Sequence, residues 1–162
     1  MDGGFNLYGY CRNPTAWIDP LGLDWNYFLS NQDDGVYYHG RASDKASLSD
    51  VMRRHGKNEG VDGARFRAGD SITQVTPKGT DIDTVRGIEN AGVREKPVLG
   101  RGSPKVRGNT IQGISDANLD TPKGTVRTNA ANSYLESHGV SKVSSLPGLD
   151  KRPHGGIKSA TC

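Results

Sequence analysis

Short stretches of alternating apolar and polar residues, separated by turn residues, begin after residue 24. Trp25 to Ser30 predicts a strand, residues 31–35 predict a hairpin loop of Asn, Gln, Asp and Gly, and Val36 to His39 predicts the partner strand. A weaker alternation from Arg65 to Thr76 predicts a third strand. We therefore expect a small antiparallel sheet whose first two strands form a hairpin.

The hairpin also predicts which tyrosines share a face. Strict alternation places Val36 and Tyr38 on one face of the second strand, and Tyr37 and His39 on the other. Tyr27 precedes Tyr38 by eleven residues, so a five-residue turn brings these two phenols to one end of the hairpin. We expect one tyrosine of the second strand to pack in the core while the other is available for chemistry.

Apolar residues at helical spacing predict a first helix after the hairpin. Ser47 is a suitable N-cap with Asp50 at N3, and Gly56 is a suitable C′ residue. The inner face of this helix consists of Leu48, Val51, Met52 and His55. With these four residues facing the core, Arg54 lies at the border of the inner face and Arg53 points furthest from it. We therefore choose Arg54 as the arginine whose side chain reaches toward the site.

Two further helices are predicted. Thr80 or Asp81 caps the second helix. Its inner face consists of Ile82, Val85, Ile88 and Ala91. Val126 to His138 predicts a third helix, after a long loop over residues 96–124 that is rich in Gly, Pro, Asn and basic residues. Residues 140–162 are expected to form a loose C-terminal tail.

Together these elements predict an α+β fold with a three-stranded antiparallel sheet, flanking helices and long Gly/Pro-rich loops. Only 31 of 162 residues are Leu, Ile, Val or Phe, so the core is expected to be small.

No window is apolar enough to span a membrane, and no basic segment followed by an apolar one marks a conventional secretory signal. Cys11 and Cys162 have no partners at metal-ligand spacing, which argues against a disulfide scaffold or zinc finger and for folding in a reducing compartment.

Charge is unevenly distributed along the chain. Residues 24–85 contain 8 Lys and Arg against 10 Asp and Glu, whereas residues 86–162 contain 12 against 6. A basic half with Gly, Ser, Asn and Arg in its loops suits a polyanion such as nucleic acid, although a solvated basic surface gives the same charge. The expected nucleic-acid contacts are Arg53, Arg86, Lys105 and Arg107.

The first 23 residues contain turn-rich motifs that stand apart from the expected core. These motifs are Asn6-Leu7-Tyr8-Gly9-Tyr10, Arg12-Asn13-Pro14 and Asp19-Pro20-Leu21-Gly22-Leu23. The set resembles the closing signature of the Rhs/YD-repeat core, the shell that encloses a toxin in bacterial polymorphic toxin systems. The resemblance implies that residues 1–23 are a shell remnant, that a toxin domain spans residues 24–139, and that the shell lies upstream in a full-length parent. In that family self-cleavage often releases the toxin at this junction.

Four motifs between residues 27 and 131 follow one another along the toxin segment. They are Val36-Tyr37-Tyr38-His39-Gly40-Arg41-Ala42-Ser43, Met52-Arg53-Arg54-His55, Val85-Arg86-Gly87-Ile88-Glu89-Asn90 and Arg107-Gly108-Asn109-Thr110-Ile111-Gln112-Gly113-Ile114-Ser115. In this order they resemble the GIY-YIG nuclease superfamily, in the toxin versions that end Rhs-type proteins. The resemblance implies a catalytic set of Tyr27, Tyr38, Arg41, Arg54 and Asn109, with Glu89 as the ligand of Mg²⁺ or another divalent metal.

These residue types suit phosphodiester hydrolysis, which needs a positioned water and compensation of charge on phosphorus and on the leaving oxygen. The carboxylate of Glu89 is a hard oxygen ligand of the kind that Mg²⁺ prefers. Tyr27 or Tyr38 is expected to orient or deprotonate the attacking water, while the guanidinium groups of Arg54 and Arg41 hold phosphate oxygens. Asn109 is expected to position the metal-binding glutamate or the phosphate.

The implied function is a DNA endonuclease toxin, with RNA as a possible substrate. Such a toxin is delivered into the target-cell cytoplasm by a dedicated secretion system, and an immunity protein with an acidic contact face blocks it in the producer. One alternative is a metal-independent ribonuclease that uses His39 or His55 as acid and base. Another is a non-catalytic nucleic-acid-binding tip, in which the tyrosines pack in a strand and Glu89 is a surface carboxylate.

Overall fold

The computed structural model describes residues 23–57, 63–105 and 107–155 of the chain. The predictions about the Rhs-like segment over residues 1–22, about both cysteines and about residues 156–162 lie outside these described residues.

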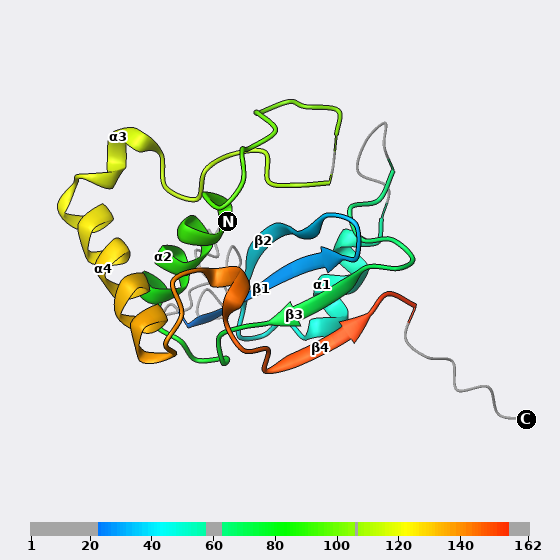
Figure 1. Cartoon of the computed structure of the whole chain (residues 1–162), viewed down its shortest axis with the longest axis horizontal. Coiled ribbons are helices and arrows are strands. Elements are labelled where there is room, and N and C mark those ends of the chain that lie inside the picture. The colour runs from blue at the N-terminus through cyan, green and yellow to red at the C-terminus, as the bar shows by residue number, and fades with distance from the viewer. Residues whose placement is uncertain (1–22, 58–62, 106, 156–162) are drawn as a thin grey trace, which may run out of the picture.

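A four-stranded antiparallel sheet in the order β2-β1-β3-β4 forms the centre of the fold (Figure 1). Its strands are β1 (Asp24–Asn31), β2 (Gly35–Ser43), β3 (Ser71–Gln74) and β4 (Asp150–Pro153). The predicted α+β class is confirmed, and so is the β1–β2 hairpin. The sheet has one strand more than predicted, and that strand comes from the segment expected to be a loose tail.

Residues 140–155 pack against the domain, contrary to the sequence-based expectation. Val143 and Leu146 are buried in the core around the short helix η2 (Val143–Ser145), and β4 pairs with β3. The sequence of β4 is polar and three of its four residues are exposed, so no alternating pattern marks it as a strand. Its conformation is determined by the free edge of β3, which it covers.

The helices begin where capping residues occur in the sequence. They are α1 (Leu48–His55), α2 (Ile82–Val93), α3 (Asp116–Leu119) and α4 (Pro122–Ser137). Ser47 and Asp50 form the predicted capping box of α1, and Asp81 caps α2. The helix α4 begins four residues earlier than predicted, because Thr121 accepts a hydrogen bond from the backbone of Gly124 and a proline occupies the first turn.

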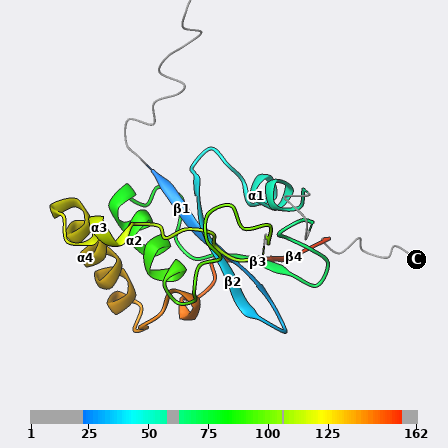
Figure 2. The same ribbon diagram turned by 90° about the horizontal axis from the view of Figure 1, so that it is seen from above.

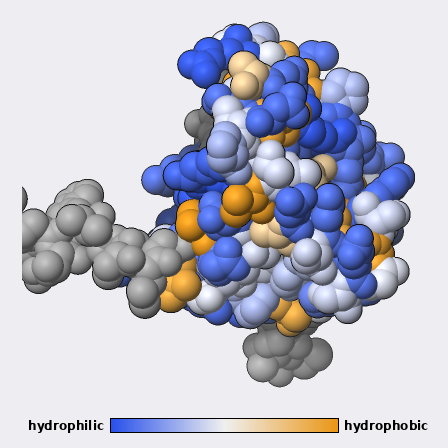
Figure 3. All heavy atoms as spheres, turned by 90° about the vertical axis from the view of Figure 1, so that its left-hand side faces the viewer, coloured by the Kyte–Doolittle hydropathy of each residue, from blue (hydrophilic) through white to orange (hydrophobic). Residues whose placement is uncertain are grey.

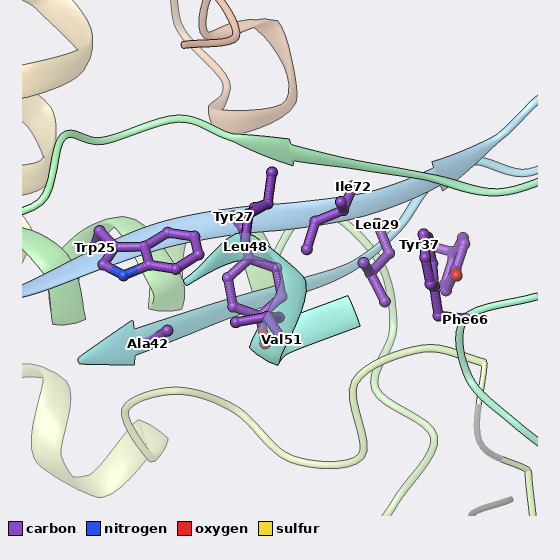
Figure 4. Close-up of a cluster of buried hydrophobic side chains, with 9 residues drawn as sticks. All are labelled: Trp25, Tyr27, Leu29, Tyr37, Ala42, Leu48, Val51, Phe66 and Ile72. Atoms are coloured by element: carbon purple, nitrogen blue, oxygen red, sulfur yellow. The ribbon is translucent and has the colours of Figure 1, made fainter. Parts of the chain in front are cut away.

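Two hydrophobic cores lie on opposite faces of the sheet, with α1 on one side and α2 with α4 on the other (Figure 2). Trp25, Tyr27 and Leu29 of β1 point toward Leu48 and Val51 of α1 (Figure 4). The opposite face of β1 contributes one residue to the second core, which contains Phe28, Val75, Ile88, Ala131, Leu135, Val143 and Leu146. Since β1 is central and covered on both faces, its first six residues are all buried.

A β-bulge changes the face on which Tyr37 lies. Leu29 pairs with Tyr38 and Ser30 pairs with Val36, which leaves Tyr37 as an extra residue in β2. Tyr37 is part of the core beneath α1, and Tyr38 packs against the same core. The prediction that these two tyrosines face opposite sides is therefore wrong, because strict alternation fails at the inserted residue.

The surface over α3 and α4 is largely hydrophilic, with hydrophobic side chains in small separate patches (Figure 3). None of the helices in the described part of the chain combines the length and the hydropathy that a membrane span requires.

Candidate active site

A polar cleft runs across the edge strand β2. One part has a volume of about 580 Å³ and the adjoining part about 310 Å³; both are lined by Tyr38, Arg41, Arg65 and Glu89. The first part is also lined by Tyr27, Asp24, Ala42, Ser43, Arg54 and His55, and the second by Arg86, Val93, Asn109, Thr110, Ile111, Gln112 and Gly113. Side chains of β1, β2, α1 and α2 that are distant in sequence thus share one site.

The two phenols differ in their exposure within the cleft. Tyr27 is 1% exposed, whereas Tyr38 is half-buried on the edge strand. Their rings lie 6.3 Å apart between centroids, across from Gly40, whose missing side chain makes room for them. Burial raises the pKa of both phenols above the ordinary value of 10.0, so both are neutral near pH 7.

Hydrogen bonds join Tyr27 to the helix α1. Arg54 Nη2 donates to Tyr27 Oη at 3.1 Å, and Tyr27 Oη lies 2.7 Å from His55 Nε2. Among the described residues, Arg54 makes no other hydrogen bond, so its remaining N–H groups are available to a ligand in the cleft. Burial, together with Arg65 and Arg54, lowers the pKa of His55 from 6.5 to about 3, so this imidazole is neutral near pH 7.

Arg65 contacts both His55 and Tyr38. Its Nη1 atom lies 3.0 Å from His55 Nδ1, and its guanidinium carbon lies 4.4 Å from the centroid of the Tyr38 ring. The ring of Tyr38 in turn meets the imidazole of His55 edge to face, with centroids 4.9 Å apart. These contacts give Tyr38 a fixed orientation at the water-facing end of the aromatic cluster.

A guanidinium links two carboxylates on the other side of the cleft. Arg41 Nη1 lies 2.7 Å from Asp24 Oδ2, and Arg41 Nε donates to Glu89 Oε2 at 3.2 Å. Burial raises the pKa of Glu89, and the charges of Arg41 and Arg86 oppose this shift. Within the part of the chain that the structure describes, the second oxygen of this carboxylate, Glu89 Oε1, has no hydrogen-bond partner.

The residues present suit a single Mg²⁺ ion at Glu89. Mg²⁺ in sites that act on phosphates is held by one or two carboxylates, by water and by the phosphate itself. Glu89 Oε1 offers such an oxygen, and Asp24 supplies a second carboxylate beside Arg41. The described residues contain no cluster of three or more His, Cys, Asp or Glu that would form a cage made of protein ligands alone.

Arg86 lines the second part of the cleft. It forms no hydrogen bond or ion pair with any residue that the structure describes. Partial burial lowers the pKa of its guanidinium, as do the charges of Arg41 and Arg127, although the carboxylates of Glu89 and Asp24 oppose them. A half-buried guanidinium whose N–H groups bond to no described residue is a candidate anion contact.

Asn109 has a structural role that the sequence did not indicate. Its amide donates from Nδ2 to the carbonyl of His39 at 2.8 Å and accepts at Oδ1 from the His39 N–H at 2.9 Å. The side chain therefore pairs with the free edge of β2 as a neighbouring strand would. Each amide atom of Asn109 thus makes one hydrogen bond to β2 and holds the loop at the cleft, while its predicted role of positioning the glutamate or the phosphate stays a prediction.

Three predicted nucleic-acid contacts do not line the cleft. Arg53 pairs with Asp50 and leaves its side chain 72% exposed, as its outward helix phase predicts. Arg107 is engaged by Asp70 through two hydrogen bonds of 2.8 and 2.9 Å and stacks over Tyr37. The backbone N–H of Lys105 donates to Ser103 in an exposed loop.

The structure also separates the two histidines. His39 is 6% exposed and faces α2, where its Nε2 lies 3.8 Å from Glu95 Oε2 in a cavity of about 20 Å³. It therefore cannot reach a substrate in the cleft. His55 lines the cleft, but its ring nitrogens face Tyr27 and Arg65.

Sequence reasoning missed Asp24 and Arg65 as cleft residues. Asp24 begins β1, and the sequence marks it only as the first residue of the expected toxin domain. Arg65 lies in a loop with no periodic pattern, so no helix or strand phase could assign it a direction.

Comparisons of the chain with family models, with curated proteins and with solved structures give no match. The motifs in the sequence and the geometry of the cleft are therefore the observations that bear on function.

Proposed function

We propose that this chain carries a metal-dependent endonuclease that hydrolyses phosphodiester bonds of DNA. The observation that supports the proposal most is the convergence of Tyr38, Arg54 and Glu89, from three separate elements, on one polar cleft. These side chains are 16 and 35 residues apart in the sequence, so local structure alone does not bring them together.

The charge of the cleft suits an anionic substrate. Four guanidinium groups line it, from Arg41, Arg54, Arg65 and Arg86, against the two carboxylates of Asp24 and Glu89. Arg86 and the remaining N–H groups of Arg54 are free of described protein partners and can bind phosphate oxygens in two-point fashion. A phosphodiester backbone provides repeated oxygens of this kind along both parts of the cleft.

Hydrolysis forms a bond between a water oxygen and phosphorus and breaks the bond from phosphorus to the leaving oxygen. One proton of the water ends on that leaving oxygen. Because burial raises the pKa of Tyr27 and Tyr38, we assign them a neutral role in orienting the water by hydrogen bonds. Arg54 and Arg86 bind the charge that develops on the phosphate.

Glu89, with Asp24 beside it, is the expected ligand of Mg²⁺. The chemistry that the ion supplies is compensation of negative charge at the scissile phosphate and at the leaving oxygen. Arg41 fixes the carboxylate of Glu89 through Oε2, which keeps Oε1 directed to a ligand of its own.

The GIY-YIG-like assignment is part of this proposal. The hairpin β1–β2 provides the paired tyrosines, α1 provides the arginine, and α2 provides the glutamate, in the order that the motifs predict. On this proposal β4, which lies on the side of the sheet away from β2, is an addition to the three strands that the resemblance implies. From the Rhs-like motifs we also propose that the domain is the toxin of an upstream shell, delivered into rival cells and blocked by an acidic immunity protein.

Cleavage of supercoiled plasmid by the purified 162-residue chain tests the proposal. We expect nicking with Mg²⁺, none with EDTA, and a loss of at least about 100-fold in Glu89→Gln. The matched control is Glu136→Gln, an exposed glutamate on α4 that should leave cleavage unchanged. RNA tested in parallel identifies the preferred substrate.

Binding of plasmid without any cleavage would favour the non-catalytic alternative. Cleavage that survives EDTA and Glu89→Gln would contradict the metal role and favour the metal-independent ribonuclease.

A further inference from the structure

The protonation of His55 follows from its contact with Arg65. Arg65 Nη1 lies 3.0 Å from His55 Nδ1. A guanidinium is always protonated and has no acceptor, so the imidazole must present a lone pair at Nδ1. Since His55 is neutral, its single ring proton is on Nε2.

This tautomer gives a direction to the hydrogen bond between His55 and Tyr27. The Nε2–H group lies 2.7 Å from Tyr27 Oη and donates to it. Arg54 Nη2 donates to the same oxygen at 3.1 Å. A phenol oxygen accepts at most two such bonds, so Tyr27 Oη is saturated as an acceptor and its own O–H is left to donate.

Tyr38 is the neighbouring phenol to which that O–H can donate, with the two ring centroids 6.3 Å apart. A hydrogen bond from Tyr27 is among the interactions that lower the pKa of Tyr38, against the larger effect of burial, which raises it. Tyr38 is also the more exposed of the two phenols and lines both parts of the cleft. The chain of hydrogen bonds thus runs outward, from His55 through Tyr27 to Tyr38.

We propose that Arg65 is a positioning residue, which holds His55 as the Nε2–H tautomer and thereby directs this chain toward Tyr38. In consequence Tyr38 is the phenol that contacts the attacking water, and Tyr27 orients Tyr38 by donating a hydrogen bond to it. His55 acts as a hydrogen-bond donor and not as a base. The part that concerns water rests on the proposed nuclease function, whereas the tautomer does not.

The tautomer can be read without any substrate. Two-bond ¹H–¹⁵N spectra of the 162-residue chain with ¹⁵N-labelled histidine distinguish protonated from unprotonated ring nitrogens, and His55→Gln assigns the signals. At pH 7.5 we expect an unprotonated Nδ1 and a protonated Nε2 for His55. In Arg65→Met we expect a shift toward the opposite tautomer, while Arg53→Met, on the outer face of α1, leaves the spectrum unchanged.

The reverse tautomer in the unmodified protein would overturn the proposal, and so would an unchanged tautomer in Arg65→Met. The first measurement needs no variant, so the proposal can be tested even where Arg65→Met does not fold.

Cleavage by two His55 variants separates a donor from a base. The side-chain amide of His55→Gln can still donate to Tyr27 but cannot accept a proton at neutral pH, whereas His55→Leu can do neither. We expect His55→Gln to cleave at least about tenfold faster than His55→Leu. Equal and complete loss in both would identify His55 as a base and overturn its assigned role. If the unmodified protein cleaves no nucleic acid, the nuclease function fails alone, since the spectra still decide the role of Arg65.

Discussion

Gly40 lies directly opposite Tyr27 in the β1–β2 ladder, and a Cβ atom placed on Gly40 would stand 2.6 Å from Tyr27 Oη. The same atom would stand 2.9 Å from the ring of Tyr38. A glycine is required here because two phenols cross the backbone of β2 at this point. The glycine in the Tyr38-His39-Gly40-Arg41 motif is thus explained by the site and not by a turn.

Gly40→Ala is therefore expected to displace both phenols. We expect a loss of about 1–3 kcal/mol in the free energy of unfolding, measured with urea, because the added methyl group overfills this part of the core. The rate of plasmid cleavage should fall by more than the decrease in the folded fraction of the protein. The control is Gly35→Ala, at the turn of the same hairpin, where a Cβ meets no atom within 4 Å but the φ of +65° is strained. It should lower stability without altering cleavage by the remaining folded protein.

Adjacent arginines on α1 are expected to behave differently. Arg54→Gln removes a donor to Tyr27 and a phosphate contact from the cleft, so the cleavage rate should fall at least about 100-fold. Arg53→Gln removes only an exposed pair with Asp50, which contributes little to stability because both groups are solvated. Comparable losses in the two variants, measured on plasmid at saturating Mg²⁺, would contradict the placement of Arg54 at the phosphate.

Arg86 and Arg107 are expected to separate binding from stability. Arg86→Gln should weaken binding to a labelled oligonucleotide in low salt and leave the unfolding midpoint nearly unchanged, because Arg86 has no partner among the described residues. Arg107→Gln should leave oligonucleotide binding intact and lower the free energy of unfolding by roughly 3 kcal/mol, because it leaves the buried carboxylate of Asp70 without its cationic partner. The opposite pattern would show that Arg107 lies on the nucleic-acid surface.

Removal of the Asn109 amide should release the loop from β2. Asn109→Ala leaves the N–H and the carbonyl of His39 without their partner, at a cost of about 2 kcal/mol in the free energy of unfolding. Asn109→Asp should cost at least as much, since a carboxylate cannot donate to that carbonyl. Hydrogen exchange at the His39 amide checks the cause, and the exposed Asn132→Ala on α4 serves as the control.

Stability should fall in mild acid because His39 is buried in its neutral form. Burial lowers its pKa from 6.5 to about 4, with Glu95 opposing the shift and Lys96 adding to it. As the pH falls below 6.5, His39 becomes protonated in the unfolded chain, whereas in the folded chain it stays neutral until about pH 4. The stability that is present above pH 6.5 is therefore lost between pH 6.5 and about pH 4. One such group contributes a slope of up to about 1.4 kcal/mol per pH unit. Urea unfolding between pH 7 and 5 should show a smaller slope for His39→Gln than for the unmodified protein, and equal slopes would contradict this assignment.

The sequence alone determined those features that depend on neighbours in the chain. Ser47 with Asp50 and the cap at Asp81 specify where two helices begin, because a capping side chain bonds to backbone three residues away. The helix phase distinguished Arg54 from Arg53, and the hairpin placed Tyr27 near Tyr38. Each of these follows from a period or a turn that spans only a few residues.

Only the tertiary structure decided which polar groups find each other across long stretches of chain. The bulge at Tyr37, the pairing of β4 with β3 and the capture of Arg107 by Asp70 join residues that no local pattern connects. The same holds for Arg65, whose loop conformation is set by packing and whose charge determines the proton on His55. A side chain in a loop carries no phase, so its partners depend on the free energy of the whole fold and not on its neighbours in sequence.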